Sequence, residues 1–133
     1  MFKEWKPIEG LYKGLNMISL TENSEEVSLV VVGFEDVPNG KKKVKLIFPR
    51  VISYRRLDES YDVNGLEDLP PVVNGESRSY LESEESEFLN WVAARAGILI
   101  EKNDLIHYKV VTGDQIFDFV CFKKFPPVVK FEE

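Results

Sequence analysis

Hydrophobic and polar residues alternate with a period of two over much of this chain, which is the pattern of β-strands with one buried face. Residues 27–34 form a β-branched run, and residues 43–48 alternate so that Val44, Leu46 and Phe48 share one face. The turn residues Pro38-Asn39-Gly40 lie between these segments, so we expect a β-hairpin. After Pro49, where we expect a bend, residues 51–56 continue as a further strand.

The same period returns near the end of the chain. Residues 106–111 and 116–122 predict two more strands around a turn at 112–114. The segment 116–122 is apolar on nearly both faces, as expected of a central strand, and Asp118 within it is interpreted as a polar residue with its hydrogen bonds satisfied. Shorter strands are expected at 16–20, 72–73 and 128–131.

One segment instead has helical spacing. Phe88, Leu89, Val92 and Ala96 recur on one face, which predicts a helix over about residues 84–96 that ends at Gly97. Ser83 is the expected N-cap, and the expected first turn is acidic, with Glu84, Glu85 and Glu87. The fold class is therefore α+β and mainly β: an antiparallel sheet or sandwich of about six to eight short strands with one helix packed on it. At 133 residues we expect a single domain over 1–133.

Acidic residues are concentrated in one block. Residues 57–88 carry ten Asp or Glu against one basic residue, Arg78, so the block has a net charge of −9 while the whole chain has −6. Within it, residues 57–82 contain Asn-Gly and Pro-Pro pairs and no clean period, which indicates a long irregular acidic segment. Charge of one sign bears on the choice of partners.

Composition narrows the range of functions and cellular settings further. The pI of about 4.9 argues against nucleic-acid binding, and the lysines at 41–43 are interpreted as a solvated hairpin turn. Cys121 is the only cysteine, so no internal disulfide can form, and it alternates with apolar residues as a core residue would. No apolar stretch has the length of a signal peptide core or a membrane span. We expect a cytoplasmic protein that does not bind membranes.

Candidate catalytic groups are few. His107 is the only histidine and has no cysteine or carboxylate at ligand spacing, so we expect neither a metal site nor a cofactor. Asp58 and Glu59 follow Arg55 and Arg56, an arrangement that favours ion pairing at a strand end over acid–base hydrolysis. Trp5 and Trp91 are interpreted as packing residues, with Trp91 partly at the surface because it only flanks the apolar stripe.

Several short motifs together carry a resemblance to a group of proteins. They are Val44-Lys45-Leu46-Ile47-Phe48, Val51-Ile52-Ser53-Tyr54-Arg55 before Asp58-Glu59, Ser86-Glu87-Phe88-Leu89-Asn90-Trp91, and Ile106-His107-Tyr108 with Phe117-Asp118-Phe119-Val120 before Pro-Pro-Val-Val. In this order the chain resembles small uncharacterised bacterial proteins, some of whose relatives are thought to be immunity proteins of polymorphic toxin systems. The resemblance implies a bacterial cytoplasmic setting and a protein partner, and it implies no catalytic site.

Three functions remain open. The favoured hypothesis is a non-enzymatic protein-binding domain, most concretely an immunity-like inhibitor of a basic toxin, because charge of opposite sign steers association. A small-molecule-binding β domain with an apolar pocket is the alternative, and a hydrolase using Asp58 or Glu59 is the third. A homo-oligomer through an edge strand is also open. The candidate partner-binding residues are Asp58, Glu59, Asp62, Glu67, Asp68, Glu76, Glu82, Glu84 and Glu85.

Overall fold

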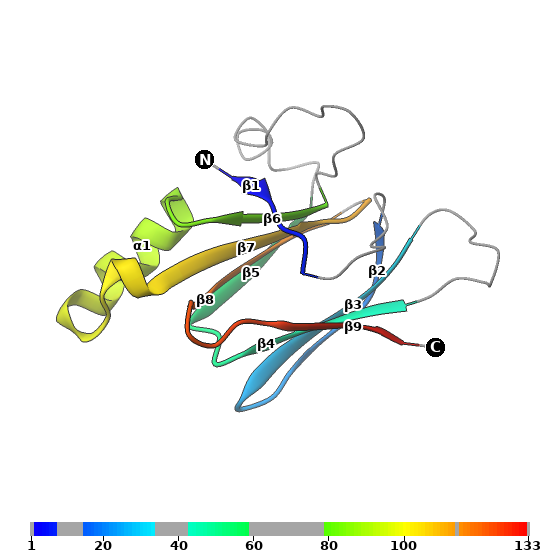
Figure 1. Ribbon diagram of the computed structural model, residues 1–133, viewed down its shortest axis with the longest axis horizontal. Helices are drawn as coiled ribbons and strands as arrows, with labels where there is room; N and C mark the ends of the chain where they lie inside the picture. Colours follow the sequence, from blue (N-terminus) through cyan, green and yellow to red (C-terminus); the bar gives the residue numbers. More distant parts are fainter. Residues whose placement is uncertain (1, 8–14, 34–42, 59–78, 114, 133) are drawn as a thin grey trace.

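The computed structural model describes residues 2–7, 15–33, 43–58, 79–113 and 115–132. These residues form nine antiparallel strands in two sheets, with one α-helix on the outer side of one sheet (Figure 1). The fold is α+β and mainly β, as the hydrophobic pattern predicts. The expected strand at 72–73, and residues 59–78 of the acidic segment, lie outside the described residues.

The larger sheet has five strands in the spatial order β1-β6-β7-β8-β5. Their bounds are β1 Lys3–Glu4, β5 Ser53–Asp58, β6 Tyr80–Ser83, β7 Leu105–Val111 and β8 Gln115–Phe122. Strand β8 lies between β7 and β5, which confirms the central position expected of its apolar sequence. It therefore has one face toward each neighbouring layer.

The smaller sheet has four strands in the order β2-β3-β4-β9. Their bounds are β2 Leu15–Glu22, β3 Glu26–Gly33, β4 Lys43–Pro49 and β9 Val128–Glu132. Strands β3 and β4 pair antiparallel with Leu29 opposite Leu46, which confirms the expected hairpin. Residues alternate between buried and partly exposed along both strands, because one face of this sheet packs against the other sheet.

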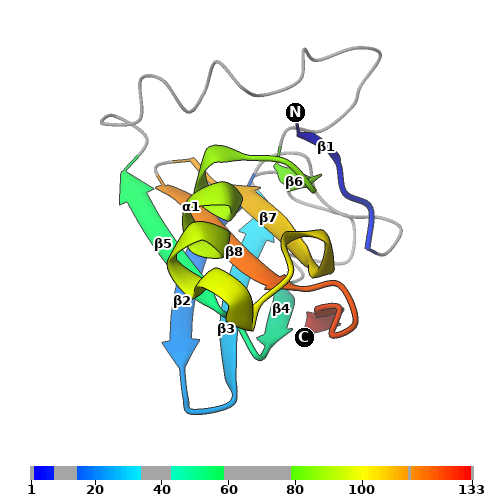
Figure 2. The same ribbon diagram turned by 90° about the vertical axis from the view of Figure 1, so that its left-hand side faces the viewer.

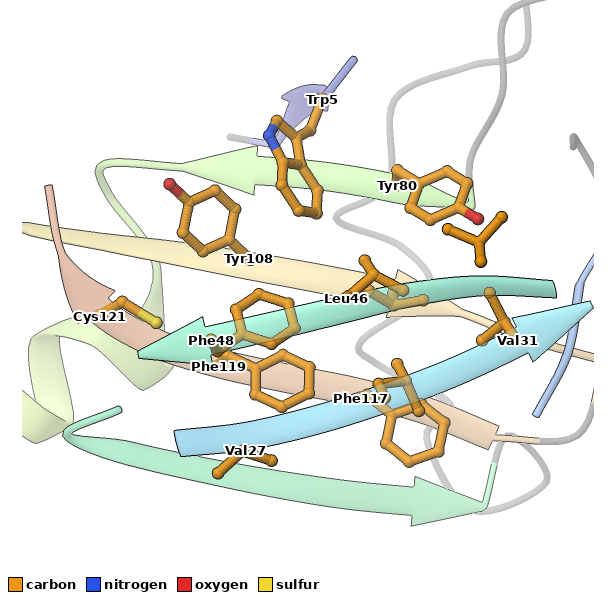
Figure 3. Packing of buried hydrophobic residues seen from close by; sticks show 13 residues of the cluster. Trp5, Val27, Val31, Leu46, Phe48, Tyr80, Tyr108, Phe117, Phe119 and Cys121 are labelled. Carbon is orange, nitrogen blue, oxygen red and sulfur yellow. The ribbon is translucent and has the colours of Figure 1, made fainter. Parts of the chain in front are cut away.

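A hydrophobic core fills the space between the two sheets (Figure 3). Phe48 of β4 stacks on Phe119 of β8 with ring centroids 3.9 Å apart, and Trp5 lies 4.6 Å from Tyr108. Cys121 is buried in the same core, where burial raises the pKa of its thiol to about 12. This confirms that Cys121 is a core residue, and Trp5 a packing residue.

A second core lies on the opposite face of the five-stranded sheet. Helix α1, Glu87–Ala96, covers this face (Figure 2), and its buried residues Phe88, Leu89 and Val92 pack against Leu105 and Val120. Gly97, with φ of 61°, ends the helix, and short 3-10 turns follow at Gly97–Leu99 and Lys102–Asp104.

The structure corrects where the helix begins. Its N-cap is Ser86, whose Oγ accepts the N–H of Leu89 at 3.1 Å, and the expected cap, Ser83, is the last residue of β6. Glu84 and Glu85 therefore precede the helix, and only Glu87 lies in its first turn. Strands β1 and β6 were also missed by the sequence pattern, because each is four residues or shorter and shows no alternation.

The chain crosses between the sheets directly after Pro49. β4 belongs to the four-stranded sheet and β5 to the five-stranded one, so the bend expected at Pro49 is a change of sheet. Arg50 makes the turn with a positive φ of 50°, and its N–H donates to the carbonyl of Glu25 at 3.0 Å. This contact holds the β4–β5 turn against the β2–β3 turn.

Candidate functional site

The sequence-predicted partner-binding residues fall into three groups in the structure. Asp58 is exposed at the end of β5. Glu82, Glu84 and Glu85 lie at the end of β6 and in the connection to α1. The remaining candidates, Glu59, Asp62, Glu67, Asp68 and Glu76, are outside the described residues.

Lysines neutralise the second group. Lys3 lies 3.5 Å from Glu82, Lys123 lies 2.9 Å from Glu84, and Lys102 lies 2.8 Å from Glu85. Hydrogen bonds from these lysines hold the pKa values of Glu84 and Glu85 below their ordinary value. The described end of the acidic block therefore presents less uncompensated negative charge than its sequence indicates.

A different part of the surface combines concave shape with uncompensated carboxylates. The β2–β3 turn and the β4–β5 turn border an open groove of about 390 Å³. Residues 22–27 and 50–54 line it, and most of these side chains are polar. We call this feature the acidic groove because Glu22, Glu25 and Glu26 are among its lining residues and Arg50 is the only basic one.

Hydrogen bonds fix the walls of the acidic groove. The Oδ1 of Asn23 accepts the N–H groups of Glu25 at 2.9 Å and Glu26 at 3.0 Å, so the β2–β3 turn is closed by its own side chain. Across the groove, the hydroxyl of Tyr54 donates to Glu22 at 2.6 Å, and this hydrogen bond raises the pKa of Tyr54. The groove therefore has a defined shape set by two turns and one cross-sheet contact.

The carboxylates of the acidic groove are not neutralised by neighbouring basic side chains of the described residues. Within the described part of the chain, Glu22, Glu25 and Glu26 form no ion pair with a lysine or arginine. The guanidinium of Arg50 stacks over the ring of Phe125, with 4.4 Å between its Cζ and the ring centroid. Residues 21–26 are all polar in the sequence, but nothing in that pattern indicates that they lie near Arg50.

A buried polar network lies under the helix on the five-stranded sheet. The Nε2 of His107 contacts Oδ1 of Asp118 at 2.5 Å, and its Nδ1 lies 2.7 Å from the hydroxyl of Ser86. Burial lowers the pKa of His107, outweighing the opposite effect of Asp118, so the ring is neutral in the folded protein. Nε2 then donates to the carboxylate, and Nδ1 accepts from Ser86.

Two cations also contact this carboxylate. The Nζ of Lys109, with its side chain 3% exposed, lies 3.2 Å from Asp118, and the Nε of Arg55 donates to it at 3.0 Å. Burial alone would raise the pKa of Asp118, but the hydrogen bond from His107 and the charges of Lys109 and Arg55 outweigh it and hold this pKa below its ordinary value. Asp118 is thus a satisfied polar residue of a central strand, as its sequence context predicts.

The order Ser86–His107–Asp118 matches the hydrogen-bonded chain of a serine hydrolase, but its geometry serves structure. The Ser86 hydroxyl is occupied at both ends: it accepts the helix N–H of Leu89 and donates to His107. His107 is 1% exposed, and the rings of Phe2 and Phe88 cover it at centroid distances of 4.8 and 5.5 Å. The network therefore ties the start of α1 to β7 and β8.

The described residues give little support to an acid–base site at Arg55 or to a metal site. Arg55 pairs with Asp118, and Glu59, which was expected to share its face of the strand, lies outside the described residues. No three His, Cys, Asp or Glu side chains in the described ranges are grouped to hold a metal ion. None of the helices in those ranges has the length and apolar character that crossing a membrane requires.

A scan against protein-family models finds no match, and searches of the curated proteins and of the solved structures find no significant similarity.

Proposed function

We propose that this chain is a non-enzymatic protein-binding domain whose partner is basic. Its most concrete form is an immunity-like protein of the bacterial cytoplasm that binds and inhibits a basic toxin. The observation that carries the proposal is the acidic groove, where Glu22, Glu25 and Glu26 line one concavity without an ion-paired lysine or arginine in the described chain.

Shape and charge together favour a protruding basic side chain or loop as the ligand. Three carboxylates around one concavity attract a cation from a distance and hold it at short range, and complementary charge raises the association rate. The hydrogen bonds of Asn23 and Tyr54 keep the groove formed, which reduces the entropy lost on binding. The predicted candidates Asp58, Glu59, Asp62, Glu67, Asp68 and Glu76 would add negative charge for the same partner.

The two alternatives fit the geometry less well. A small-molecule site was expected as an apolar pocket, but aromatic side chains fill the space between the sheets and the acidic groove is mostly polar. A hydrolase using Asp58 or Glu59 was expected to draw on Arg55 or Arg56, and of these two arginines Arg55 pairs with Asp118. Protein binding is the function that these contacts support best.

The experiment compares charge reversal in the groove with a matched reversal elsewhere. Tagged protein would be used to isolate a partner from its host, and the affinity of that purified partner would be measured by calorimetry at low and high salt. We expect the Glu25→Lys/Glu26→Lys variant to bind at least about tenfold more weakly at low salt, since each close charge pair can contribute more than 1 kcal/mol.

The control variant, Glu101→Lys/Asp104→Lys, changes the net charge equally on exposed residues remote from the groove in sequence. We expect it to change affinity by less than about twofold. A third variant, Glu67→Lys/Asp68→Lys, tests the candidates from the sequence. Equal affinity of the Glu25→Lys/Glu26→Lys variant and the unmodified protein at low salt would overturn the groove as the docking site.

A further inference from the structure

Large apolar side chains are exposed on helix α1 and on the turn that follows it. Trp91 is 52% exposed, and Ile98 and Leu99, in the 3-10 turn that follows the helix, are 99% and 86% exposed. Three such residues close together in sequence are unusual for a surface, and exposed apolar patches of this kind mark sites of association. With Glu87 and Arg95 they form what we call the helix strip.

Contacts within the protein hold the centre of the strip in place. The guanidinium of Arg95 lies over the ring of Trp91, with 5.0 Å from Cζ to the centroid. On the other side, Trp91 stacks on Phe88 at 6.2 Å, and Arg55 lies over Phe88 at 4.3 Å. Trp91 is thus an oriented, half-exposed aromatic side chain of the type that anchors protein interfaces.

Charge in the strip is symmetric about Trp91. Glu87 lies four residues before it and Arg95 four residues after it, so all three follow one side of the helix. Neither Glu87 nor Arg95 has an ion-pair partner among the described residues, whereas Glu84 and Glu85, just before the helix, are both paired with lysines. The strip therefore offers one unpaired charge of each sign at equal distances from an aromatic centre.

We propose that the helix strip binds a second copy of this chain, with the two α1 helices antiparallel about a two-fold axis at Trp91. In this arrangement Glu87 of each copy faces Arg95 of the other, and the two Trp91 rings meet at the axis. A two-fold interface needs this kind of self-complementary surface, because each residue pair occurs twice. Antiparallel helices also bring opposite ends of their dipoles together.

The same arrangement gives Ile98 and Leu99 a surface to cover. They follow the C-terminal end of α1, and in an antiparallel pair this end lies beside the start of the other helix and its connection at residues 84–86. Lys123 and Lys102 already neutralise the carboxylates of that connection, so covering it leaves no charge unpaired. Ala94, on the exposed side of α1, lets the two helices approach closely.

Oligomeric state measured by sedimentation equilibrium tests the inference. We expect a monomer–dimer equilibrium with a dissociation constant on the order of 10 µM, as befits a small interface. The Ile98→Glu/Leu99→Glu variant should be monomeric at about 500 µM, at least fiftyfold above that constant. Both residues are exposed, so the variant should keep the circular dichroism spectrum and melting temperature of the parent. A parent protein that stays monomeric at the same concentration would overturn the proposal.

Charge swaps distinguish the two-fold arrangement from other self-association. Glu87→Arg places two arginines opposite each other, and Arg95→Glu two glutamates, so each single variant should weaken the dimer about tenfold or more. The double variant Glu87→Arg/Arg95→Glu should recover it, and mixing the two single variants should give a heterodimer. If the single variants weakened the dimer but neither the double variant nor the mixture restored it, the pairing of Glu87 with Arg95 of the other copy would be overturned.

The helix strip and the acidic groove lie on different elements, so dimerisation and binding of a basic partner can be tested independently of each other. The variants of α1 leave the turns of β2–β3 and β4–β5 unchanged, and should retain affinity for a basic partner. The Glu25→Lys/Glu26→Lys variant should dimerise as the parent does. Loss of dimerisation in that variant would contradict the assignment of the interface to α1.

Discussion

Asp118 shows how a single residue can hold three neighbouring strands of one sheet together. Its carboxylate, on a central strand, meets a neutral histidine, a buried lysine and a half-exposed arginine, each from a neighbouring strand. A buried charge is tolerated only when it is paired and hydrogen-bonded. Because the buried Lys109 forms its ion pair with the same carboxylate, removing Asp118 alone leaves the lysine charge uncompensated.

Asp118→Asn should therefore be strongly destabilising. It leaves Lys109 buried opposite a neutral amide, and breaking a buried pair in this way costs about 3–5 kcal/mol. Urea denaturation measures the free energy of unfolding. The control Glu101→Gln, on an exposed turn, should change it by less than about 0.5 kcal/mol.

A second substitution separates charge from packing. Adding Lys109→Met to Asp118→Asn removes the unpaired cation and should recover a measurable part of the lost stability. The role given to this pair would be contradicted if Asp118→Asn alone lowered the free energy of unfolding by less than about 1 kcal/mol and adding Lys109→Met recovered none of that loss.

His107 should make stability depend on pH. Its pKa is lowered in the folded state from an unfolded value of 6.5, so below that value the unfolded chain binds a proton that the folded chain does not. Stability is thus fully present above about pH 6.5 and falls as the pH drops toward the folded pKa, by up to about 1.4 kcal/mol per pH unit. Urea denaturation between about pH 5 and 7 measures this slope.

The chain has a direct control for this slope. His107 is the only histidine, so His107→Gln should flatten the profile between about pH 5 and 6.5. Asp118, whose pKa is also lowered, contributes its own loss only below about pH 4, near its ordinary value. An unchanged slope in His107→Gln would rule out His107 as its source.

At the scale of elements, the start of α1 depends on tertiary contacts. Ser83 and Ser86 are three residues apart, and each is followed by glutamate. Both serines close a local turn: Ser83 Oγ accepts the N–H of Glu85, and Ser86 Oγ accepts the N–H of Leu89. Ser83 lies in β6 opposite His107 of β7, whereas the hydroxyl of Ser86 hydrogen-bonds the His107 ring, so contacts with this strand select which serine caps the helix.

Ser86→Ala should cost about 1–2 kcal/mol of stability, near the upper end for an N-cap, because it also leaves Nδ1 of His107 without a donor. Thermal unfolding followed by circular dichroism measures the loss. Ser86→Thr, which keeps a hydroxyl, and Ser24→Ala, on an exposed turn, serve as controls and should lie close to the parent. A neutral effect of Ser86→Ala would show that the cap contributes nothing.

For the whole molecule, the five-stranded sheet is the layer that joins both cores. One face packs on the four-stranded sheet through aromatic residues, and the other packs on α1 (Figure 2). Phe119 lies at the centre of the inter-sheet contact, stacked on Phe48 and next to Tyr54, and is fully buried. Its contacts therefore hold one sheet to the other.

Phe119→Ala should destabilise the fold by about 3–5 kcal/mol, because it removes the stacked pair and leaves a cavity between the sheets. Leu57→Ala, at a position 38% exposed on β5, is the apolar control and should cost less than about 1 kcal/mol. Chemical denaturation of both variants measures the difference. Equal losses would contradict a core centred on Phe119.

Much of the fold could be predicted from the sequence because its signals are local. Alternation of period two depends only on neighbouring residues and predicted the β3–β4 hairpin, and an equally local run of apolar residues predicted the buried central strand β8. The helix was predicted on the same grounds, but three residues early, because Glu84 and Glu85 look like a first turn until Ser86 is seen to contact β7. Strands as short as β1 and β6 carry no period and could not be found.

The sequence by itself determined the fold class, the core positions and the concentration of acid in residues 57–88. Only the tertiary structure decided which charges are compensated. Lysines distant in sequence neutralise Glu82, Glu84 and Glu85, and the acidic groove joins two turns more than twenty residues apart. The physical reason is that alternation and capping act between near neighbours, whereas ion pairs and concave surfaces depend on which distant segments the folded chain brings together.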